Sequence, residues 1–143
     1  MGTKERYPYL GDTLSPRERS ERMSRVRSKN TKPELVVRQL LHSMGYRYRL
    51  HVRSVPGNPD IVFSPRRKAI FVHGCFWHRH PGCPNCRLPK SKLGFWLPKL
   101  KGNRRRDLKK QRELTKAGWQ FFVVWECQVS DPSLAHQLRE FLR

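Results

Sequence analysis

The segment from His73 to Cys83 constrains this chain more than any other part of its sequence. It reads His-Gly-Cys-Phe-Trp-His-Arg-His-Pro-Gly-Cys, so three histidines and two cysteines fall within eleven residues. Cys86 follows three positions later, and Cys127 is the remaining cysteine. This density predicts a bound metal ion, because imidazole nitrogens and thiolates are the ligands that zinc prefers. Buried structural cysteines are the alternative interpretation.

The charge of the chain points to a polyanionic partner. Its 143 residues include 31 Lys and Arg but 11 Asp and Glu, which gives a formal net charge of +20. Nucleic acid is the usual partner of so basic a chain, and an anionic membrane surface is the main rival. No run is apolar enough to span a bilayer, and the N-terminus lacks the apolar stretch of a secretory signal. We therefore expect a cytoplasmic protein without disulfides or membrane association.

The beginning of the chain predicts an arm and two helix starts. Residues 1–14 show no periodicity and are expected to form a mobile basic arm ahead of one domain over 15–143. Capping boxes at 15–18 and 31–34 predict that a helix begins at each. The first helix, about 15–28, is very basic and poor in apolar residues, so we expect it to contact DNA rather than a core.

Apolar residues beyond the second capping box follow helical periodicity in some segments and strand periodicity in others. The expected elements are a helix ending near Gly45, strands over 47–52, 60–63 and 69–72, a helical turn over 95–100, a basic helix over 103–117, a strand over 119–125 and a helix over 134–142. This order, α-β-β-β-α-β-α, predicts an α/β fold of the α+β type with a mixed sheet.

One of the scarce acidic residues stands at the entrance to an expected strand. Asp60 follows Pro59 and precedes three apolar residues, where a carboxylate would hold a hard cation such as Mg²⁺ beside a scissile phosphate. A simple turn residue is the alternative. The next expected strand ends in His73, so neighbouring strands would present titratable side chains together. Glu34 would join them if the start of its helix faces that sheet end, and otherwise it only completes a capping box.

The chain offers more candidate zinc ligands than the four that tetrahedral zinc needs. They are Cys75, His78, His80, Cys83, Cys86 and Cys127. We expect a closed structural zinc site rather than a catalytic one, because the sequence suggests no hydride or oxygen chemistry elsewhere. His73 and His78 are candidates for proton transfer near neutral pH. Asp107, in the expected basic helix, either orients one of these histidines or pairs with a basic residue of its own helix.

Three aromatic residues are candidates for insertion between DNA bases. Phe76 and Trp77 lie in the expected metal loop, and Trp96 follows it. An apolar wedge must unstack a base step, so it favours steps that deform easily. Core packing is the alternative, and we accept it for Trp119 and Trp125, which belong to an expected strand.

Residues from about Glu21 to Val129 resemble the very-short-patch repair (Vsr) endonucleases, which nick DNA at T:G mismatches. The matching parts are Met23 ahead of Glu34, residues 56–60, 71–78, 95–97, 102–103 with Asp107, 118–119 and 124–127. The Gly-Cys-Phe-Trp-His run at 74–78 is the most specific of them, together with Trp-Glu-Cys at 125–127. The chain departs from the family pattern where Pro81-Gly82 precedes Cys83, in the extra thiol of Cys86, and in a longer arm before Ser15.

The resemblance implies a restriction-endonuclease-like core and double-stranded DNA with a T:G mismatch as the partner. It implies that Asp60 binds Mg²⁺ and that His73 and His78 serve hydrolysis, with Glu34 and Asp107 nearby. The implied ligands of a structural zinc ion are Cys75, His80, Cys83 and Cys127, with Cys86 as the alternative to His80. The implied intercalating residues are Phe76, Trp77 and Trp96 from one side and Met23 from the other.

Three functions remain open from the sequence. The first is a monomeric, Mg²⁺-dependent enzyme that nicks one strand at a mismatch, since one active site suits one nick. The second is a zinc-stabilised nucleic-acid-binding module without catalysis, which would leave Asp60, Glu34 and two histidines without a role. The third is a site-specific or nonspecific nickase, which needs the same active site but has no mismatch preference.

Overall fold

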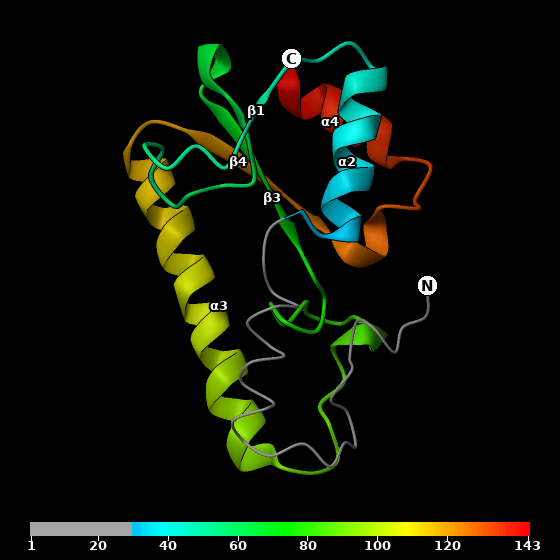
Figure 1. Ribbon diagram of the computed structural model, residues 1–143, viewed down its shortest axis with the longest axis vertical. Coiled ribbons are helices and arrows are strands. Elements are labelled where there is room, and N and C mark those ends of the chain that lie inside the picture. Colours follow the sequence, from blue (N-terminus) through cyan, green and yellow to red (C-terminus); the bar gives the residue numbers. More distant parts are fainter. Residues whose placement is uncertain (1–29) are drawn as a thin grey trace.

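The computed structural model describes residues 30–143, and its long elements follow the predicted order α-β-β-β-α-β-α (Figure 1). They are α2 (Lys32–Ser43), β1 (Arg49–Leu50), β2 (Ile61–Phe63), β3 (Lys68–His73), α3 (Leu93–Lys116), β4 (Gln120–Trp125) and α4 (Leu134–Leu142). Short 3-10 helices lie at Ser64–Arg66, Pro84–Cys86 and Glu126–Gln128. The expected arm over 1–14, the helix over 15–28 and Met23 lie outside the described residues.

The described strands form a four-stranded mixed sheet in the order β1-β2-β3-β4. β2 pairs antiparallel with both β1 and β3, whereas β3 and β4 run parallel. The parallel register extends from Lys68 opposite Gln120 to His73 opposite Trp125. The chain therefore leaves β3 and β4 at the same edge of the sheet.

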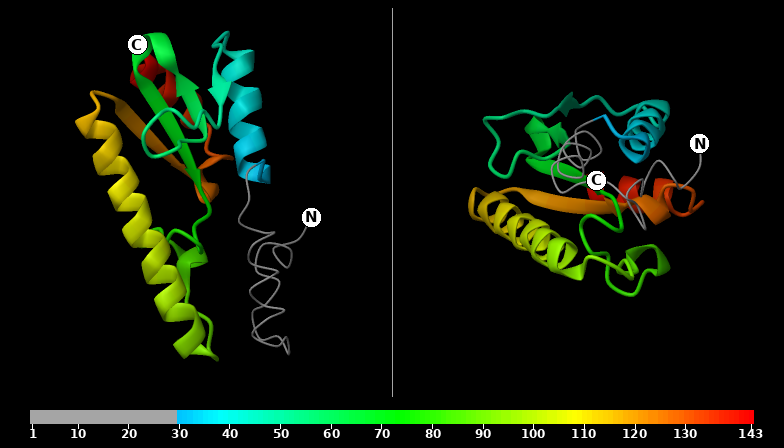
Figure 2. Two further views of the ribbon diagram at one scale, coloured as in Figure 1. Left: turned by 60° about the vertical axis from the view of Figure 1, so that its left-hand side comes forward. Right: turned by 60° about the horizontal axis from the view of Figure 1, so that its bottom comes forward.

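Helices cover both faces of this sheet. Figure 2 shows α3 on one side of the sheet and α2 on the other, with α4 beside α2 in Figure 1. Alternating strand residues fill the two cores, as the period of two along a strand requires. Ile61 and Ile70 pack with α2 and α4, whereas Val62 and Ala69 pack with Leu114 of α3.

The long helix α3 corrects one expectation. It runs unbroken from Leu93 to Lys116, where the sequence predicted a turn over 95–100 and a separate helix over 103–117. Pro98 lies within it and removes one backbone hydrogen bond, but Trp96 and Leu100 are buried on either side and hold this segment in place. Within residues 30–143, no helix combines the length and apolar character needed to cross a membrane.

Strand β1 is shorter than expected, and its end faces the start of β2. Only Arg49–Leu50 pair in the sheet, instead of residues 47–52. His51 turns the chain out of the strand with a φ of +48°, and its N–H donates to the carbonyl oxygen of Asp60 over 3.1 Å. Positive φ is uncommon outside glycine, so this conformation interrupts the strand.

The turn before β2 is fixed against α3 by a glycine. Gly57 has a φ of +80°, and a Cβ atom there would lie 2.8 Å from the backbone carbonyl oxygen of Lys110. Only glycine permits both this conformation and this approach. The contact determines where Asp60 enters the sheet.

We predict that the α2 face in the core contributes strongly to stability. Leu41 is fully buried, whereas Leu35 of the same helix is 43% exposed. Leu41→Ala should lower the free energy of unfolding by about 2–5 kcal/mol, because a cavity adds to the lost burial. Leu35→Ala, the matched control, should change it by less than about 1 kcal/mol. Urea unfolding measures both, and equal effects would contradict the packing of α2.

Candidate active site and thiol cluster

Side chains from separate elements converge where β3 and β4 end. They form an acidic group, a histidine group and a thiol group, each with metal-capable donor atoms within 4.8 Å of one another. The acidic group is Glu34, His51 and Asp60; the histidine group is His73, His78 and Asp107; the thiol group is Cys75, His80, Cys83 and Cys127. Every residue that the resemblance implied as catalytic or as a primary zinc ligand belongs to one of these groups.

The acidic group joins the start of α2 to the sheet. Asp60 accepts a hydrogen bond from the N–H of Val72 over 2.7 Å, which ties the start of β2 to β3. Glu34 is buried and lies 2.9 Å from His51, and it also forms an ion pair with Arg38. The start of α2 therefore does face the sheet end, as a functional role for Glu34 required.

Glu34 keeps its capping position as well. Its N–H donates to the hydroxyl oxygen of Thr31 over 3.4 Å, and its carboxylate accepts the N–H of Asn30 over 3.2 Å. The two interpretations of this residue are thus compatible, because one carboxylate both caps the helix and contacts His51.

The carboxyl group of Asp60 is electrostatically unusual. Burial raises its pKa from 3.8 to about 7, against the opposing effect of the Val72 hydrogen bond. The nearby carboxylate of Glu34 also raises this pKa, whereas the positive charges of His78 and Lys110 lower it. Desolvation outweighs these positive charges, and a bound divalent cation would further stabilise the ionised carboxylate.

The histidine group has the geometry of an oriented base. Nδ1 of His78 lies 2.6 Å from Oδ2 of Asp107. Because an ionised carboxylate only accepts hydrogen bonds, Nδ1 carries the proton and Nε2 is left as the basic nitrogen. The ring of His73 stacks on that of His78, with 4.0 Å between centroids and 6° between planes. Asp107 therefore contacts the histidines, and His73 limits how the His78 ring can turn.

His73 itself is buried and neutral. Desolvation, with a further contribution from the charge of His78, lowers its pKa to about 3. Its Nε2 lies 4.0 Å from Asp107, and its Nδ1 has no hydrogen-bond partner among residues 30–143. An uncharged imidazole can donate a hydrogen bond to an incoming group without bringing a second positive charge next to His78.

The thiol group closes across the two parallel strands. Cys75 follows β3 and Cys127 follows β4, and their sulfur atoms lie 3.6 Å and 3.5 Å from Nδ1 of His80. Tetrahedral zinc, with Zn–S near 2.3 Å and Zn–N near 2.1 Å, would separate such atoms by about 3.6 Å. The His80 ring stacks on Trp125 at 4.2 Å, which fixes its orientation. These four donors fit a single tetrahedral ion.

Two thiols of this group, Cys75 and Cys127, resist ionisation without a cation. Burial raises the pKa of Cys75 to about 12 and also raises the pKa of Cys127. A metal ion binds the deprotonated thiolate, so metal binding would release these protons. The sulfur atoms would then carry negative charge only when the metal is bound.

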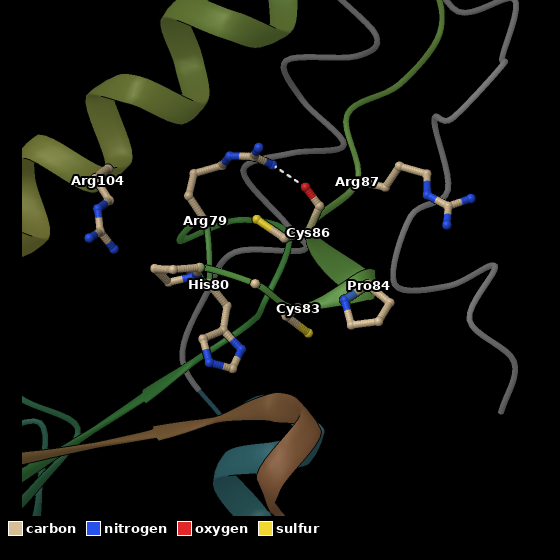
Figure 3. A pocket seen from close by; sticks show the side chains of 9 residues that line it. Arg79, His80, Cys83, Pro84, Cys86, Arg87 and Arg104 are labelled. Atoms are coloured by element: carbon tan, nitrogen blue, oxygen red, sulfur yellow. Dashed lines mark hydrogen bonds between the residues drawn. The ribbon is translucent and has the colours of Figure 1, made fainter.

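Cys86 stands apart from the thiol group. Figure 3 shows its sulfur directed toward Arg79, whereas His80 and Cys83 point toward the end of β4. The guanidinium of Arg79 donates to the carbonyl oxygen of Cys86 over 2.6 Å. Three arginines line the open cavity on this side of the loop: Arg79, Arg87 and Arg104. The geometry therefore favours His80 over Cys86 as the fourth ligand.

The candidate wedge residues are buried in this structure. Phe76, Trp77 and Trp96 are 1%, 5% and 1% exposed and pack with Leu100 of α3 in a cluster separate from the two sheet cores. Asn103 donates to the carbonyl oxygen of Trp77 over 3.1 Å and holds the loop to α3. Insertion into DNA would require these rings to leave this cluster.

Two contact residues escaped the sequence analysis. His51 looked like an ordinary strand residue, although an antiparallel hairpin in which Leu50 pairs with Ile61 places it opposite Asp60. The sequence indicated Glu126 only as the middle residue of the Trp-Glu-Cys motif at 125–127. In the structure its carboxylate accepts a hydrogen bond from the N–H of Cys75 over 3.2 Å. Strand pairing is the signal that would have revealed His51.

Comparison with known proteins identifies the family. The sequence profile of the family described as DNA mismatch endonuclease Vsr matches residues 11–94. The chain belongs to the Vsr family. It is 54% identical over 134 residues to the Type II nicking enzyme V.XorIIP of Xanthomonas oryzae pv. oryzae, covering 93% of this chain and 98% of that relative. It is 33% identical over 139 residues to the DNA mismatch endonuclease Vsr of Escherichia coli, covering 93% and 88%.

Structural similarity agrees with this assignment at the level of the fold. The catalytic domain of the homing endonuclease I-Bth0305I superposes with a TM-score of 0.52 at 20% identity, covering 78% of this chain and 94% of that domain. The mixed sheet with helices on both faces is thus a restriction-endonuclease-like architecture, as predicted. With its Vsr-family membership, the chain is a DNA endonuclease.

The raised pKa of Asp60 predicts a pH-dependent stability. Between its ordinary value of 3.8 and about 7, the folded state retains a proton that the unfolded state has lost. Stability should therefore fall as pH rises through this window, by at most about 1.4 kcal/mol per pH unit. Urea unfolding of the wild type relative to Asp60→Asn, without added Mg²⁺, isolates this contribution. A difference that stays flat or grows with pH would contradict the environment described for Asp60.

Proposed function

We propose that this Vsr-family protein is a Mg²⁺-dependent endonuclease that nicks one strand of double-stranded DNA beside the T of a T:G mismatch. The main support is the juxtaposition of two groups at one sheet end, a desolvated carboxylate and an imidazole oriented by a second carboxylate. The charge of His78 influences the pKa of Asp60, so the two groups lie within electrostatic reach. Mismatch recognition is supported by the similarity to the Escherichia coli relative, which is a DNA mismatch endonuclease by name.

Asp60 is the residue proposed to hold the cation. A carboxylate oxygen is the kind of ligand that Mg²⁺ prefers, and the positive charges near Asp60 do not outweigh the cost of its burial. Mg²⁺ bound there would neutralise charge on the scissile phosphate. Proton transfer from the attacking water and hydrogen bonding to the phosphate would be performed by protein side chains.

His78 is the proposed general base. Asp107 holds the proton on Nδ1, which leaves Nε2 free to accept a proton from the attacking water. His73, neutral and stacked on His78, would donate a hydrogen bond to the phosphate or the leaving oxygen. One site of this kind suits a monomer that makes one nick.

A zinc ion on the thiol group is proposed to fix the loop that carries His78. Three thiols and one imidazole match a closed structural zinc site. Cys75 and His80 flank His78 in sequence, so a metal bound to both restrains the intervening backbone. The ion would thus support catalysis without contacting substrate.

The DNA duplex is proposed to lie along the basic surface of α3. Seven of the exposed side chains of this helix are basic: Lys101, Arg105, Arg106, Lys109, Lys110, Arg112 and Lys116. We propose that the aromatic cluster opens on DNA and that Phe76, Trp77 and Trp96 contact the mismatch from one side, with Met23 on the other. A mispaired step is easier to unstack, which would favour it as the insertion point.

A second candidate is a nickase without mismatch preference. The Xanthomonas relative is a Type II nicking enzyme by name, with no mention of a mismatch. This candidate uses the same Asp60 and histidines, so only the choice of duplex separates it from the first.

A strand-resolved cleavage assay tests the function. End-labelled duplexes with T:G, T:A or C:G at one position should show a Mg²⁺-dependent nick beside the T of T:G alone. Asp60→Ala should slow nicking by at least about 100-fold, because the cation loses its main ligand. Asp131→Ala, a carboxylate exposed near α4, is the matched control and should nick normally.

Two outcomes of that assay would revise the proposal. Nicking of all three duplexes at one rate would favour the nickase without mismatch preference. Nicking by Asp60→Ala at the wild-type rate would show that the proposed cation site takes no part in hydrolysis.

The proposed zinc site predicts that replacing Cys83 and replacing Cys86 have different effects on zinc retention. Cys83→Ser should lose the metal on dialysis against a chelator, because serine is a poor zinc ligand. Cys86→Ser should retain one zinc ion per chain like the wild type, since its sulfur lies outside the thiol group. Elemental analysis of the dialysed proteins measures the metal content. The reverse pattern would make Cys86 the ligand.

A further inference from the structure

His51 lies between the two carboxylates of the acidic group. Its Nε2 is 2.9 Å from Oε2 of Glu34, and its Nδ1 is 3.9 Å from Oδ1 of Asp60. The first separation is that of a hydrogen bond, whereas the second is too long for one. The two ring nitrogens therefore have different roles.

The contact with Glu34 assigns the proton on the ring. A carboxylate in an ion pair with Arg38 accepts hydrogen bonds and does not donate them, so Nε2 carries the hydrogen. Arg38 also approaches Nε2, but at 3.4 Å this contact is longer than the one to Glu34. With the proton on Nε2, Nδ1 keeps its lone pair on the side of Asp60.

The distance between His51 and Asp60 suits two ligands of one ion. Donor atoms that each lie about 2.1 Å from a metal are roughly 3.0 Å apart at a right angle and roughly 4.2 Å apart in line. The observed 3.9 Å between Nδ1 and Oδ1 falls within this range. The separation of these atoms is therefore compatible with two ligands of one cation.

The backbone at His51 is held in a costly conformation. Its φ of +48° is unfavourable for a side chain with a Cβ atom, and such strain tends to occur at functional positions. The hydrogen bond from its N–H to the carbonyl oxygen of Asp60 maintains this conformation. The main chain thus couples His51 to the residue that its ring faces.

We propose that His51 supplies Nδ1 as a ligand to the cation bound by Asp60, and that Glu34 orients the ring through Nε2. This inference rests on the cation-binding role proposed above for Asp60. A carboxylate behind the second nitrogen of a metal-bound imidazole fixes its tautomer and direction, which is the arrangement seen here. An imidazole ligand suits first-row transition ions more than Mg²⁺, so the site should bind Mn²⁺ more tightly than Mg²⁺.

Manganese binding provides the test, because Mn²⁺ is paramagnetic and favours oxygen and nitrogen ligands over thiolates. The protein is first loaded with zinc so that the thiol group is occupied, and Mn²⁺ is then titrated and followed by EPR. The variant is His51→Asn, since asparagine tolerates positive φ. His42→Asn, which removes an exposed histidine of α2, is the matched control.

The wild type and His42→Asn should show a ¹⁴N coupling to bound Mn²⁺ in pulsed EPR, and His51→Asn should lose it. His51→Asn should also weaken Mn²⁺ binding by about tenfold or more. Competition with Mg²⁺ should show a smaller loss for that ion, because it gains less from an imidazole. Equal zinc content and circular dichroism confirm that the variants are folded.

Asp60→Ala separates failure of this inference from failure of the proposed function. If Asp60→Ala abolishes Mn²⁺ binding while His51→Asn keeps both the affinity and the ¹⁴N coupling, the ligand role of His51 is wrong and the cation site stands. If Asp60→Ala binds Mn²⁺ as tightly as the wild type, the cation site itself is wrong. Equal weakening of Mn²⁺ and Mg²⁺ with an unchanged coupling would also overturn ligation by His51.

Discussion

The parallel pairing of β3 with β4 is the constraint on which the site depends. Because these strands run in one direction, His73 and Trp125 end side by side, and the segments that follow them leave at one edge. The metal-capable atoms of Cys75 and Cys127 can therefore lie together although the two residues are far apart in the sequence. The carboxylate of Glu126, 51 positions after Cys75, also accepts a hydrogen bond across this edge. In an antiparallel pair the second cysteine would lie at the opposite end of the sheet.

The distribution of charge would allow so basic a chain to bind the proposed cation as well as DNA. It has only 11 acidic residues against 31 basic ones, yet Glu34, Asp60 and Asp107 gather at one sheet end. The long helix α3 carries exposed basic residues and also supplies Asp107. A phosphate backbone would be attracted by the surrounding positive field, while the local carboxylates would provide the proposed metal site and orient the proposed base.

Much of the fold was predictable because its signals are local. Thr31 and Glu34 mark the start of α2, and the short apolar runs of β2, β3 and β4 lie between evident turns. Continuity of α3 was not predictable, since the cost of Pro98 is local whereas the burial of Trp96 that offsets it is tertiary. Residue types named the candidate ligands, but only strand pairing could bring them together.

At the site, too, the sequence named the candidate residues but could not give their geometry. A list of histidines and cysteines could not choose between His80 and Cys86, because that choice depends on which way a loop directs each side chain. The role inferred for His51 depends on its positive φ, which cannot be predicted from the residue type. Likewise, the sequence could not decide between insertion and core packing for Phe76, which is buried in the structure.

The central claim is that a metal on the thiol group positions the histidine that performs the chemistry. Nitrogen-15 NMR of the histidine side chains during a zinc titration tests it most directly. The account predicts that Nδ1 of His80 shifts to a metal-bound value and that the Nδ1–H of His78, bonded to Asp107, becomes protected from exchange in step with it. An unchanged His80, or a His78 proton that is equally protected without zinc, would contradict the claim.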